Sequence, residues 1–259
     1  MVNANSFILL ALAAARKEYY RAQTIDRLLQ KQGLPISHES NATIALSDSE
    51  GGYLIKALLT PTTRTYVEWG SGGSTELVSW LILSDLMRPD FMAVSIESSA
   101  KWVSYMRNRS TLIRRAERGG QMRLIHGSMG PVGHLGYPKG FVHSDSKRTR
   151  AYVGLDNKLA GRKVDLALVD GRFRLACMLE SYSHLRHLRN QHGVPRVLLH
   201  DYAVLPPGLH QRRFNQYSLA LQFYDLTQRN DTLATFVPKP NASRVAIAAA
   251  LRSALVHPD

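Results

Sequence analysis

Short apolar runs alternate along this chain with longer segments whose apolar residues recur at helical spacing. The first five runs lie at residues 65–69, 91–97, 122–126, 164–169 and 195–199, and each has the length of one β-strand. The helical segments between them lie at about 75–87, 100–117 and 173–191, and they end close to glycine or proline. Strands that alternate with helices predict an α/β protein with a mostly parallel sheet.

The end of the chain continues this pattern less clearly. Residues 212–226 fit a helix, and 233–237 fit a strand. Residues 244–249 fit a last strand or, because of their alanines, a helix. Counting that segment as a strand, we predict a doubly wound, mostly parallel sheet of seven strands.

The segments outside the alternating pattern define the predicted domain organisation. We expect a helix over 4–32, a polar connector over 33–49 and a short helix over 49–59. Residues 129–163 contain six glycines and two prolines, which predicts a long basic loop and not a second domain. The chain is thus predicted to hold an N-terminal helical extension over 1–45 and one domain over 46–259.

A glycine-rich turn, E-W-G-S-G-G-S-T at 68–75, joins the first predicted strand to the first helix. Such a turn lets the backbone approach a ligand, and it aims the N–H groups of the first helical turn at that ligand. Gly70 and Gly72 can adopt positive φ, and a side chain at either would obstruct a ligand. Ser74 and Thr75 suit the helix N-terminus.

A carboxylate at the end of the second strand strengthens this interpretation. Glu97 follows Gly70 by 27 residues, and an acidic residue there can accept hydrogen bonds from both hydroxyls of a ribose. The pair predicts a site for a nucleoside-containing cofactor. The residues after Gly72 are Gly-Ser-Thr and not x-x-Gly, and Glu68 precedes the turn, which favours S-adenosylmethionine over NAD.

The motifs E-x-G-x-G-G-S-T at 68–75, S-I-E at 95–97 and V-D-L-A-L-V-D-G at 164–171 resemble those of class I S-adenosylmethionine-dependent methyltransferases. A narrower resemblance, over about 46–240, is to a branch known mainly from bacterial and algal sequences. It rests on 66–75, on I-H-G-S-M-G-P-V-G-H-L-G-Y-P at 125–138, on V-D-G-R-F-R-L-A-C at 169–177 and on H-D-Y at 200–202. The resemblance implies the fold and the cofactor, and it does not specify the substrate.

Both the motifs and the resemblance give a set of expected site residues. The residues expected to bind the cofactor are Glu68, Gly70, Ser71, Gly72, Gly73, Ser74, Glu97, Ser98, Gly127, Ser128 and Asp170. Those expected to bind the methyl acceptor are Arg172, Arg174, Tyr202, Arg213 and Tyr217. Arg172 and Arg174 fit an anionic substrate or a role in neutralising Asp170.

Carboxylates recur where predicted strands end, which is the edge at which open α/β sheets bind ligands. Besides Glu68 and Glu97, these are Asp170 and Asp201. In the resembled fold the last two lie on neighbouring strands, so they are candidates to share a hydroxyl proton or to hold Mg²⁺. Each carboxylate is equally suited to cap the helix that follows it.

Histidine supplies the candidate base and a weaker candidate metal site. His200, with Asp201 and Asp170, is the candidate catalytic group, since histidine titrates near neutral pH and an attacking alcohol must lose its proton. A structural histidine beside the sheet is the alternative. His184 and His187 lie one helical turn apart among cations, which favours a solvated helix face over a metal site. His134, His143 and Asp145 lie in the predicted loop.

Composition adds one strong feature, an uneven positive charge. The 259 residues, 44% of them hydrophobic, suffice for one large domain, and the single cysteine, Cys177, rules out an internal disulfide and suits burial. The net charge is +13, and residues 101–163 hold 14 Lys and Arg against 3 Asp and Glu. Such a segment attracts phosphates, acidic glycans or anionic surfaces, although a solvated arginine-rich surface explains it equally well.

The apolar run at 6–15 leaves localisation open. It suits the h-region of a secretory signal, yet no Lys or Arg precedes it, so we favour the start of an amphipathic helix. No stretch is long enough to predict a membrane span. Four N-x-S/T sequons, at Asn41, Asn108, Asn230 and Asn241, keep a secretory or Golgi location possible beside a cytoplasmic one.

Three functions therefore compete at this stage. The leading hypothesis is O-methylation of a sugar, a glycan or another small hydroxyl acceptor. The basic segment suggests a nucleic-acid methyltransferase, although no base-methylation motif of the Asn-Pro-Pro-Tyr type and no RNA-binding module is recognisable. The third hypothesis is a non-catalytic, methyltransferase-like subunit of a large assembly.

Overall fold

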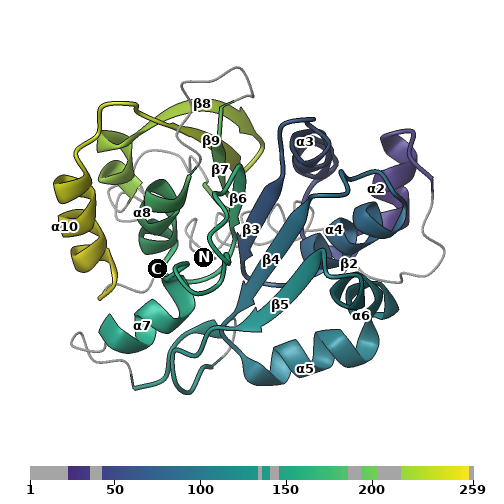
Figure 1. Cartoon of the computed structure of the whole chain (residues 1–259), viewed down its shortest axis with the longest axis horizontal. Helices are drawn as coiled ribbons and strands as arrows, with labels where there is room; N and C mark the ends of the chain where they lie inside the picture. Colours follow the sequence, from purple (N-terminus) through teal and green to yellow (C-terminus); the bar gives the residue numbers. More distant parts are fainter. Residues whose placement is uncertain are drawn as a thin grey trace, which may run out of the picture.

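A seven-stranded sheet forms the centre of the computed structural model, which describes residues 23–35, 43–133, 136–140, 146–185, 194–202 and 217–256 (Figure 1). Its strands are β3 (Thr65–Trp69), β4 (Met92–Glu97), β5 (Met122–His126), β6 (Leu166–Val169), β7 (Arg196–Leu199), β8 (Tyr224–Asn230) and β9 (Leu233–Pro238). The order is β5-β4-β3-β6-β7-β9-β8, and β9 alone runs in the direction opposite to the other six strands. The predicted mostly parallel, seven-stranded α/β sheet is confirmed.

Chain order reverses between β3 and β6, which lie side by side in the sheet. In an open α/β sheet, the crevice beyond the carboxyl ends of the strands at such a switch point is where ligands bind. The five parallel strands all end at this edge. The fold therefore brings the residues that follow β3, β4, β6 and β7 to one side of the molecule.

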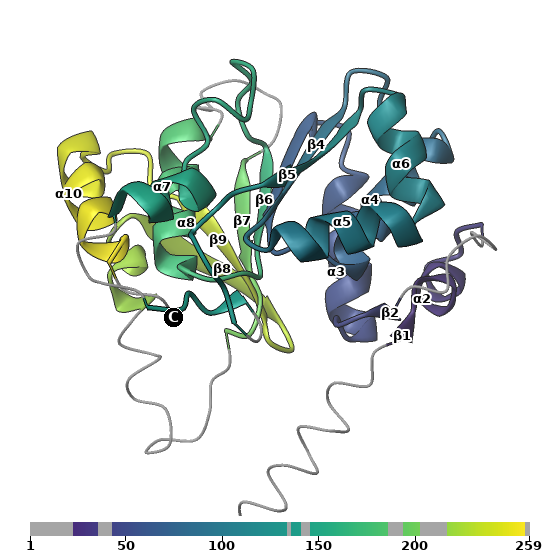
Figure 2. The same ribbon diagram turned by 90° about the horizontal axis from the view of Figure 1, so that it is seen from below.

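Helices cover both faces of the sheet, as Figure 2 shows. One face packs against α7 (Ser146–Val153), α8 (Arg174–His184) and α10 (Arg244–Ala254), and the other against α3 (Asp48–Leu58), α4 (Gly73–Leu83) and α6 (Thr111–Arg118). Alternation within the strands produces the two cores. Val67 and Trp69 of β3 enter the first core and Tyr66 enters the second, as expected for a strand buried on both faces.

The described part of the N-terminal extension packs into the second core. It consists of β1 (Gln23–Thr24), α2 (Ile25–Lys31) and β2 (Thr43–Ile44), and Leu28 and Leu29 are fully buried. A helix was expected over 4–32, and the described part of it is α2 alone. Residues 6–15 lie outside the described residues. No helix in the described part of the chain is long and apolar enough to cross a membrane.

Two predicted boundaries were wrong for local reasons. The helix expected over 100–117 is two helices, α5 (Ala100–Arg109) and α6, which meet at Ser110. Ser110 has extended backbone angles, and its hydroxyl accepts a hydrogen bond from the N–H of Ile113. A serine that caps a new helix in this way ends the previous one.

The segment 129–163 is not a loop throughout, because it contains α7. Tyr152 and Val153 of this helix are buried in the core, so tertiary packing outweighs the glycine-rich and charged composition around them. Residues 134–135 and 141–145, which include His134, His143 and Asp145, lie outside the described residues.

The last elements exchange roles relative to the prediction. Residues 244–254 form α10, and the seventh strand is β8, in a segment expected to be helical up to residue 226. Most side chains of β8 are at least partly exposed, so this edge strand lacks the apolar alternation that identifies a strand in sequence. Only the short 3₁₀ helix η2 (Ala220–Gln222) and residues 217–218 are helical in the described part of 212–226.

Candidate active site

The glycine turn after β3 is shaped by close backbone contacts. Gly70 has φ of 94°, and a Cβ there would lie 2.8 Å from the carbonyl oxygen of Asp170. A Cβ on Gly73 would collide with the backbone of Thr43. Gly72 differs, because its φ of 178° suits any residue, and a Cβ there would meet no protein atom within 4 Å. The expectation of positive φ at Gly72 was therefore wrong.

Glu68 stabilises this turn through buried hydrogen bonds. It is fully buried, and it accepts hydrogen bonds from the hydroxyls of Tyr66 and Thr75. Thr75 in turn accepts the N–H of Gly72 at 3.0 Å. Burial raises the pKa of Glu68 more than its hydrogen bonds lower it. The prediction of direct cofactor contact by Glu68 is corrected, because its carboxylate holds the turn and does not line the cavity.

Glu97 ends β4, and its carboxylate makes four hydrogen bonds with the chain itself. One oxygen accepts from the N–H and the hydroxyl of Ser71, at 3.1 and 3.2 Å. The other accepts from the hydroxyl of Ser98 and the N–H of Ser99, at 3.1 and 2.8 Å. Glu97 thus fixes the entry to α5 and lines the cavity at once, so the capping role and the ligand role coexist.

A cavity of about 570 Å³ opens between these elements. This volume lies within the range of small-molecule sites. The glycine turn, the start of α4 and Glu97 with Ser98 form one side, and Asp170 with Arg172 forms another. Eight of the eleven expected cofactor residues line it, namely Gly70, Ser71, Gly72, Gly73, Ser74, Glu97, Ser98 and Asp170. Their roles toward a cofactor stay predictions.

Of the three expected cofactor residues outside the cavity lining, Glu68 is described above, and the other two are Gly127 and Ser128. Gly127 is buried, and a Cβ there would lie 2.7 Å from the Cα of Tyr152. The structure thus gives Gly127 a packing role beneath α7, which sequence reasoning missed because it expected no helix in that segment.

Several lining residues were not foreseen. Trp102 of α5 is exposed, and its indole N–H donates to the carbonyl of Ser71 at 2.9 Å. Tyr152 lies behind Gly171, where any Cβ would collide with its hydroxyl. Ile44 and its neighbours supply a further wall from the segment before α3. The only sequence signal was the glycine at position 171, where the Tyr152 hydroxyl leaves no room for a side chain.

Asp170, His200 and Asp201 meet at the ends of β6 and β7. The Nδ1 atom of His200 lies 2.8 Å from Oδ1 of Asp170 and 4.0 Å from Oδ1 of Asp201. The guanidinium of Arg174 donates to Asp201 at 3.0 Å and to the carbonyl of His200 at 2.6 Å, and it lies 4.0 Å from Asp170. The sequence prediction that these residues share one sheet edge is confirmed.

His200 is unsuited to the role of general base. It is 3% exposed, and its second nitrogen, Nε2, lies 3.7 Å from Glu50. Burial lowers the pKa of His200, but Asp170 and the polar contacts with Asp170 and Glu50 raise it more, to well above its usual value. Because both ring nitrogens face carboxylates and His200 does not line the cavity, its imidazole is not placed to accept the proton of an attacking alcohol. His200 therefore positions Asp170.

The expected acceptor residues separate into two groups. Arg172 lines the cavity, with its guanidinium 4.0 Å from the ring centre of Tyr137. Arg174 is buried against Asp201, so the neutralising role foreseen for it is the one the structure supports. Tyr202 and Tyr217 are buried with their rings 5.8 Å apart, so the prediction of acceptor contact by them is corrected. Arg213 and His187 lie outside the described residues.

Glu50 completes the cluster and was not foreseen. Its carboxylate accepts the N–H and hydroxyl of Thr232, at 2.8 and 2.6 Å, and the N–H of Ser47 at 2.8 Å. Burial raises the pKa of Glu50, but hydrogen bonds from His200, Thr232 and Ser47 lower it more, to about 2. The sequence signal is the S-x-x-E capping box at 47–50, which explains the helix start but not the contact with His200.

Asp201 has a backbone conformation that supports a role for this edge. Its φ is 56°, a left-handed value that Asp tolerates better than most residues. Phe173, just before α8, has φ of 53°, which is rarer for an aromatic residue. Such conformations persist where surrounding contacts hold them, and they cluster at functional sites.

Comparison with known proteins bears on the fold. No protein-family model and no curated protein matches the sequence. A methyltransferase-like protein from Silicibacter pomeroyi has a TM-score of 0.55 and 21% identity, over 77% of this chain and 92% of its own. A candidate O-methyltransferase from Klebsiella pneumoniae has a TM-score of 0.46 and 13% identity, over 83% and 88%. A methyltransferase from Geobacter sulfurreducens has a TM-score of 0.42 and 12% identity, over 83% and 87%.

Identities this low inform the architecture and leave the acceptor open. The likeness to the Silicibacter pomeroyi protein covers 92% of that protein and bears on the fold alone. The chain has a Rossmann-like α/β fold similar to that of this methyltransferase-like protein.

Proposed function

We propose that this protein is an S-adenosylmethionine-dependent methyltransferase that acts on a hydroxyl group of a sugar, a glycan or another small acceptor. The observation that supports it most is one cavity lined by the glycine turn, by Glu97 and by Asp170. S-adenosylmethionine supplies a methyl group made electrophilic by its sulfonium charge. The cavity is lined by three acidic residues, Glu76, Glu97 and Asp170, and by two arginines, so acidic residues outnumber basic ones there although the chain has a net charge of +13, which suits a cationic ligand.

The glycine turn fits the ligand on structural grounds. Gly72 lines the cavity, and the space a Cβ would occupy is empty of protein atoms. Gly73 and Ser74 begin α4 and line the same wall of the cavity. The first N–H groups of any α-helix have no carbonyl acceptor within that helix, so those of Gly73 and Ser74 are suited to a ligand. They suit the carboxylate of an amino-acid moiety, and Glu97 suits the ribose hydroxyls.

Asp170 is the candidate group for the acceptor side. It lines the cavity, and one of its oxygens is fixed by His200. A carboxylate held this way can accept a hydrogen bond from an acceptor hydroxyl and orient it for attack. Mg²⁺ is not part of the proposal, because Arg174 already supplies positive charge to Asp170 and Asp201.

The test measures binding first and turnover second. Titration calorimetry of the full chain is expected to show S-adenosylmethionine binding at micromolar concentration, and mass spectrometry of the purified protein tests for a bound small molecule. No binding at about 1 mM, which corresponds to less than about 4 kcal/mol, would overturn the proposal. Binding without product formation on any hydroxyl acceptor would favour the non-catalytic alternative.

A matched pair of variants localises the binding. Gly72→Leu places a side chain in the cavity without backbone strain, so binding should be lost while the melting temperature is kept. Gly119→Leu is the control, because Gly119 has φ of −70°, is exposed and only meets ordinary contacts at 3.5 Å. Equal binding by both variants would place the ligand elsewhere.

A nucleic-acid acceptor is the second candidate, and an aromatic pair beside the cavity favours it. Trp102 and Tyr105 are 40% and 45% exposed and stack at 5.0 Å, with Arg109 over the tyrosine ring at 5.9 Å. Exposed aromatic rings and arginines bind unstacked bases. Filter binding of single-stranded RNA should then weaken steeply with salt and drop in Tyr105→Ala.

A further inference from the structure

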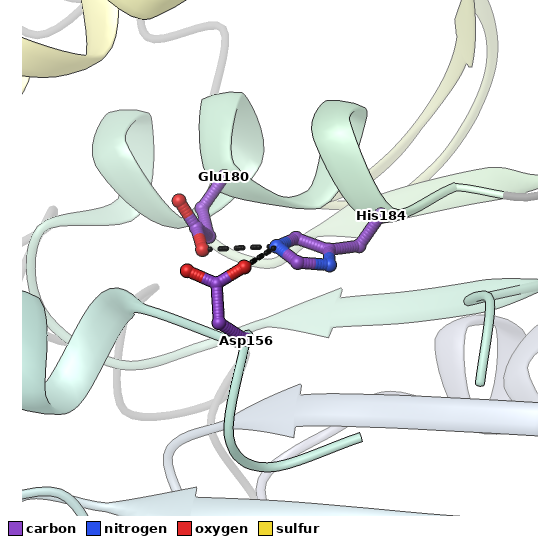
Figure 3. Close-up of side chains that lie close together, drawn as sticks. All are labelled: Asp156, Glu180 and His184. Carbon is purple, nitrogen blue, oxygen red and sulfur yellow. Dashed lines mark hydrogen bonds and ion pairs between the residues drawn. The ribbon is translucent and has the colours of Figure 1, made fainter. Parts of the chain in front are cut away.

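A second cluster of one histidine and two carboxylates lies at the far end of α8 from Arg174. Glu180 and His184 are four residues apart on α8, and Asp156 follows α7 (Figure 3). The Nε2 atom of His184 lies 3.2 Å from Oε1 of Glu180 and 3.5 Å from Oδ1 of Asp156. The sequence had suggested a solvated helix face, but the His184 side chain is only 15% exposed.

Hydrogen bonding alone does not account for this arrangement. Both carboxylates approach the same imidazole nitrogen, as Figure 3 shows. A single N–H can make a near-linear hydrogen bond to only one acceptor, so one of the two carboxylates lacks a well-aligned donor from His184. A metal ion at this point would instead accept one donor atom from each of the three side chains. All three donor atoms lie within 4.8 Å of one another.

The spacing suits a small transition-metal ion. Bonds of about 2.0–2.2 Å from zinc to nitrogen and oxygen, arranged tetrahedrally, place neighbouring donor atoms roughly 3.3–3.5 Å apart. The distances of 3.2 and 3.5 Å from His184 to the two carboxylates are close to this spacing. The N–H of Leu155 also donates to Oε1 of Glu180 at 2.9 Å, which fixes the carboxylate as outer partners of metal ligands do.

The charge balance also points to a cation. Among the described residues, no Lys or Arg forms an ion pair with Glu180 or Asp156, although the chain holds 33 Lys and Arg. Lys158 and Arg150 lie near enough to interact electrostatically with Glu180, but neither forms an ion pair with it, and the ammonium of Lys158 donates to the carbonyl of Gly154. Glu180 is only 4% exposed, and carboxylates buried to this degree are seldom left without a cation or a metal.

We propose that Asp156, Glu180 and His184 bind a divalent transition-metal ion of the zinc type, with solvent in the remaining coordination position. Two oxygens and one imidazole nitrogen form a ligand set that zinc accepts. The ion would join the turn after α7 to α8. Because α7 carries Tyr152 into the cavity wall, the ion would stabilise that wall from behind.

The test uses the full chain, freed of metal with a chelator and titrated with Zn²⁺ by calorimetry and by thermal unfolding. One equivalent should bind, and a hundredfold excess of zinc over Kd should raise the melting temperature by about 5–10 °C. Substitution by Co²⁺ should give the visible absorption of a tetrahedral site. Mg²⁺, which prefers six oxygen ligands, should have no effect.

Variants assign the site to these residues. Asp156→Asn is the primary variant, because the Asp156 side chain is 81% exposed and its change leaves the fold intact, yet zinc affinity should fall at least tenfold. His184→Ala should abolish the binding of zinc. His126 is an exposed histidine at the end of β5, and the control His126→Ala should still bind one equivalent of zinc. Equal zinc binding by the parent chain, Asp156→Asn and His184→Ala would overturn the proposal, as would no binding to the parent chain.

Discussion

Two clusters in this molecule contain one histidine and two carboxylates, and they satisfy their charges in different ways. In the cluster of Asp170, His200 and Asp201, the buried Arg174 reaches both carboxylates, and Glu50 faces the second nitrogen of His200. In the cluster of Asp156, Glu180 and His184, both carboxylates face one nitrogen, and no arginine or lysine of the described residues pairs with them.

The difference shows that residue type and spacing alone do not define a metal site. Both sets bring their donor atoms within 4.8 Å of one another. A guanidinium inside the first cluster competes with a metal ion for the same oxygens, and removing a charge from such a buried network is costly. In the second cluster, Lys158 and Arg150 are near, but no guanidinium or ammonium of the described residues forms an ion pair with either carboxylate. We therefore expect the two to respond oppositely to substitution and to metal.

The largest effect should come from removing the internal cation. Arg174→Ala leaves Asp201 and Asp170 without their guanidinium, and breaking a buried pair in this way costs about 3–5 kcal/mol. Thermal unfolding should show a large drop in melting temperature. Mg²⁺ should partly restore the melting temperature of this variant and should leave that of the parent chain unchanged. Arg172→Ala, beside the cavity, is the control and should change stability far less.

If Arg174→Ala unfolded no more readily than Arg172→Ala, the carboxylates would not depend on Arg174 for charge balance. The contrast between the two clusters would then disappear. A Mg²⁺ effect on the parent chain equal to that on Arg174→Ala would do the same, since it would show that Arg174 does not exclude the ion.

The next effect concerns acid. The pKa of Glu50 is about 2 in the folded protein against a reference value of 4.5, so its stabilising contribution is complete above pH 4.5 and is lost as the pH falls toward 2. The loss should be about 3 kcal/mol over that interval. Glu50→Gln should have a lower free energy of unfolding at neutral pH, and that free energy should fall less steeply than in the parent chain as the pH drops below 4.5. Urea unfolding at pH 6, 4 and 3 measures both.

Asp225→Asn provides the control for that experiment, because the Asp225 side chain is 61% exposed and its ion pair with Lys239 spans 3.7 Å. Its acid profile should follow that of the parent chain. An acid limb in Glu50→Gln as steep as in the parent would show that other carboxylates cause the loss, and that Glu50 does not bind the first cluster together.

Glu97 extends the comparison to a carboxylate that is satisfied by neutral donors only. Two of its four bonds come from the rotatable hydroxyls of Ser71 and Ser98, which ribose hydroxyls can replace. Glu97→Ala should weaken S-adenosylmethionine binding at least tenfold, since hydrogen bonds to a charged group contribute about 1.5–3 kcal/mol each. It should also lower the melting temperature, because the N–H groups of Ser71 and Ser99 lose their acceptor.

The two readouts of Glu97→Ala separate its roles. Ser99→Ala removes a cap of α5 without touching the Glu97 carboxylate, so it should lower the melting temperature by a similar amount and keep the affinity. A lowered melting temperature with unchanged S-adenosylmethionine affinity in Glu97→Ala would contradict the ribose role and leave only the structural one.

The strands on either side of the switch point could be predicted from local sequence. The strands ending at Trp69 and Glu97 and the one ending at Val169 have continuous apolar runs, because they are buried on both faces. The carboxyl ends of parallel strands share one edge of a sheet, so the sequence alone places Glu97 and Asp170 there, and Asp201 joins them after the strand that ends at Leu199.

The remainder depended on contacts between distant segments. Nothing near Glu50 in the sequence indicates His200, since 150 residues separate them and their meeting requires the whole sheet. Tyr152 was missed because a basic, glycine-rich composition hides a helix that only packing stabilises. The contacts that disfavour His200 as a base have no local signature either, because Glu50 and Asp170 reach its two nitrogens from distant segments.

The smallest effect is a matched pair of aspartate substitutions, one in each cluster. Asp201→Asn keeps a residue that tolerates the left-handed backbone at φ of 56°, so it isolates the loss of charge beside Arg174. We expect it to cost about 1–3 kcal/mol, as expected for a charged hydrogen bond that is about three-quarters shielded from solvent. Asp156→Asn in chelator should change the free energy of unfolding by less than about 0.5 kcal/mol, because its side chain is 81% exposed. Adding zinc should then stabilise the parent chain and not Asp156→Asn, whereas Asp201→Asn should gain as much from zinc as the parent. An equal loss of unfolding free energy in Asp201→Asn and Asp156→Asn without metal would contradict the proposed difference between the cluster that contains Arg174 and the cluster around His184.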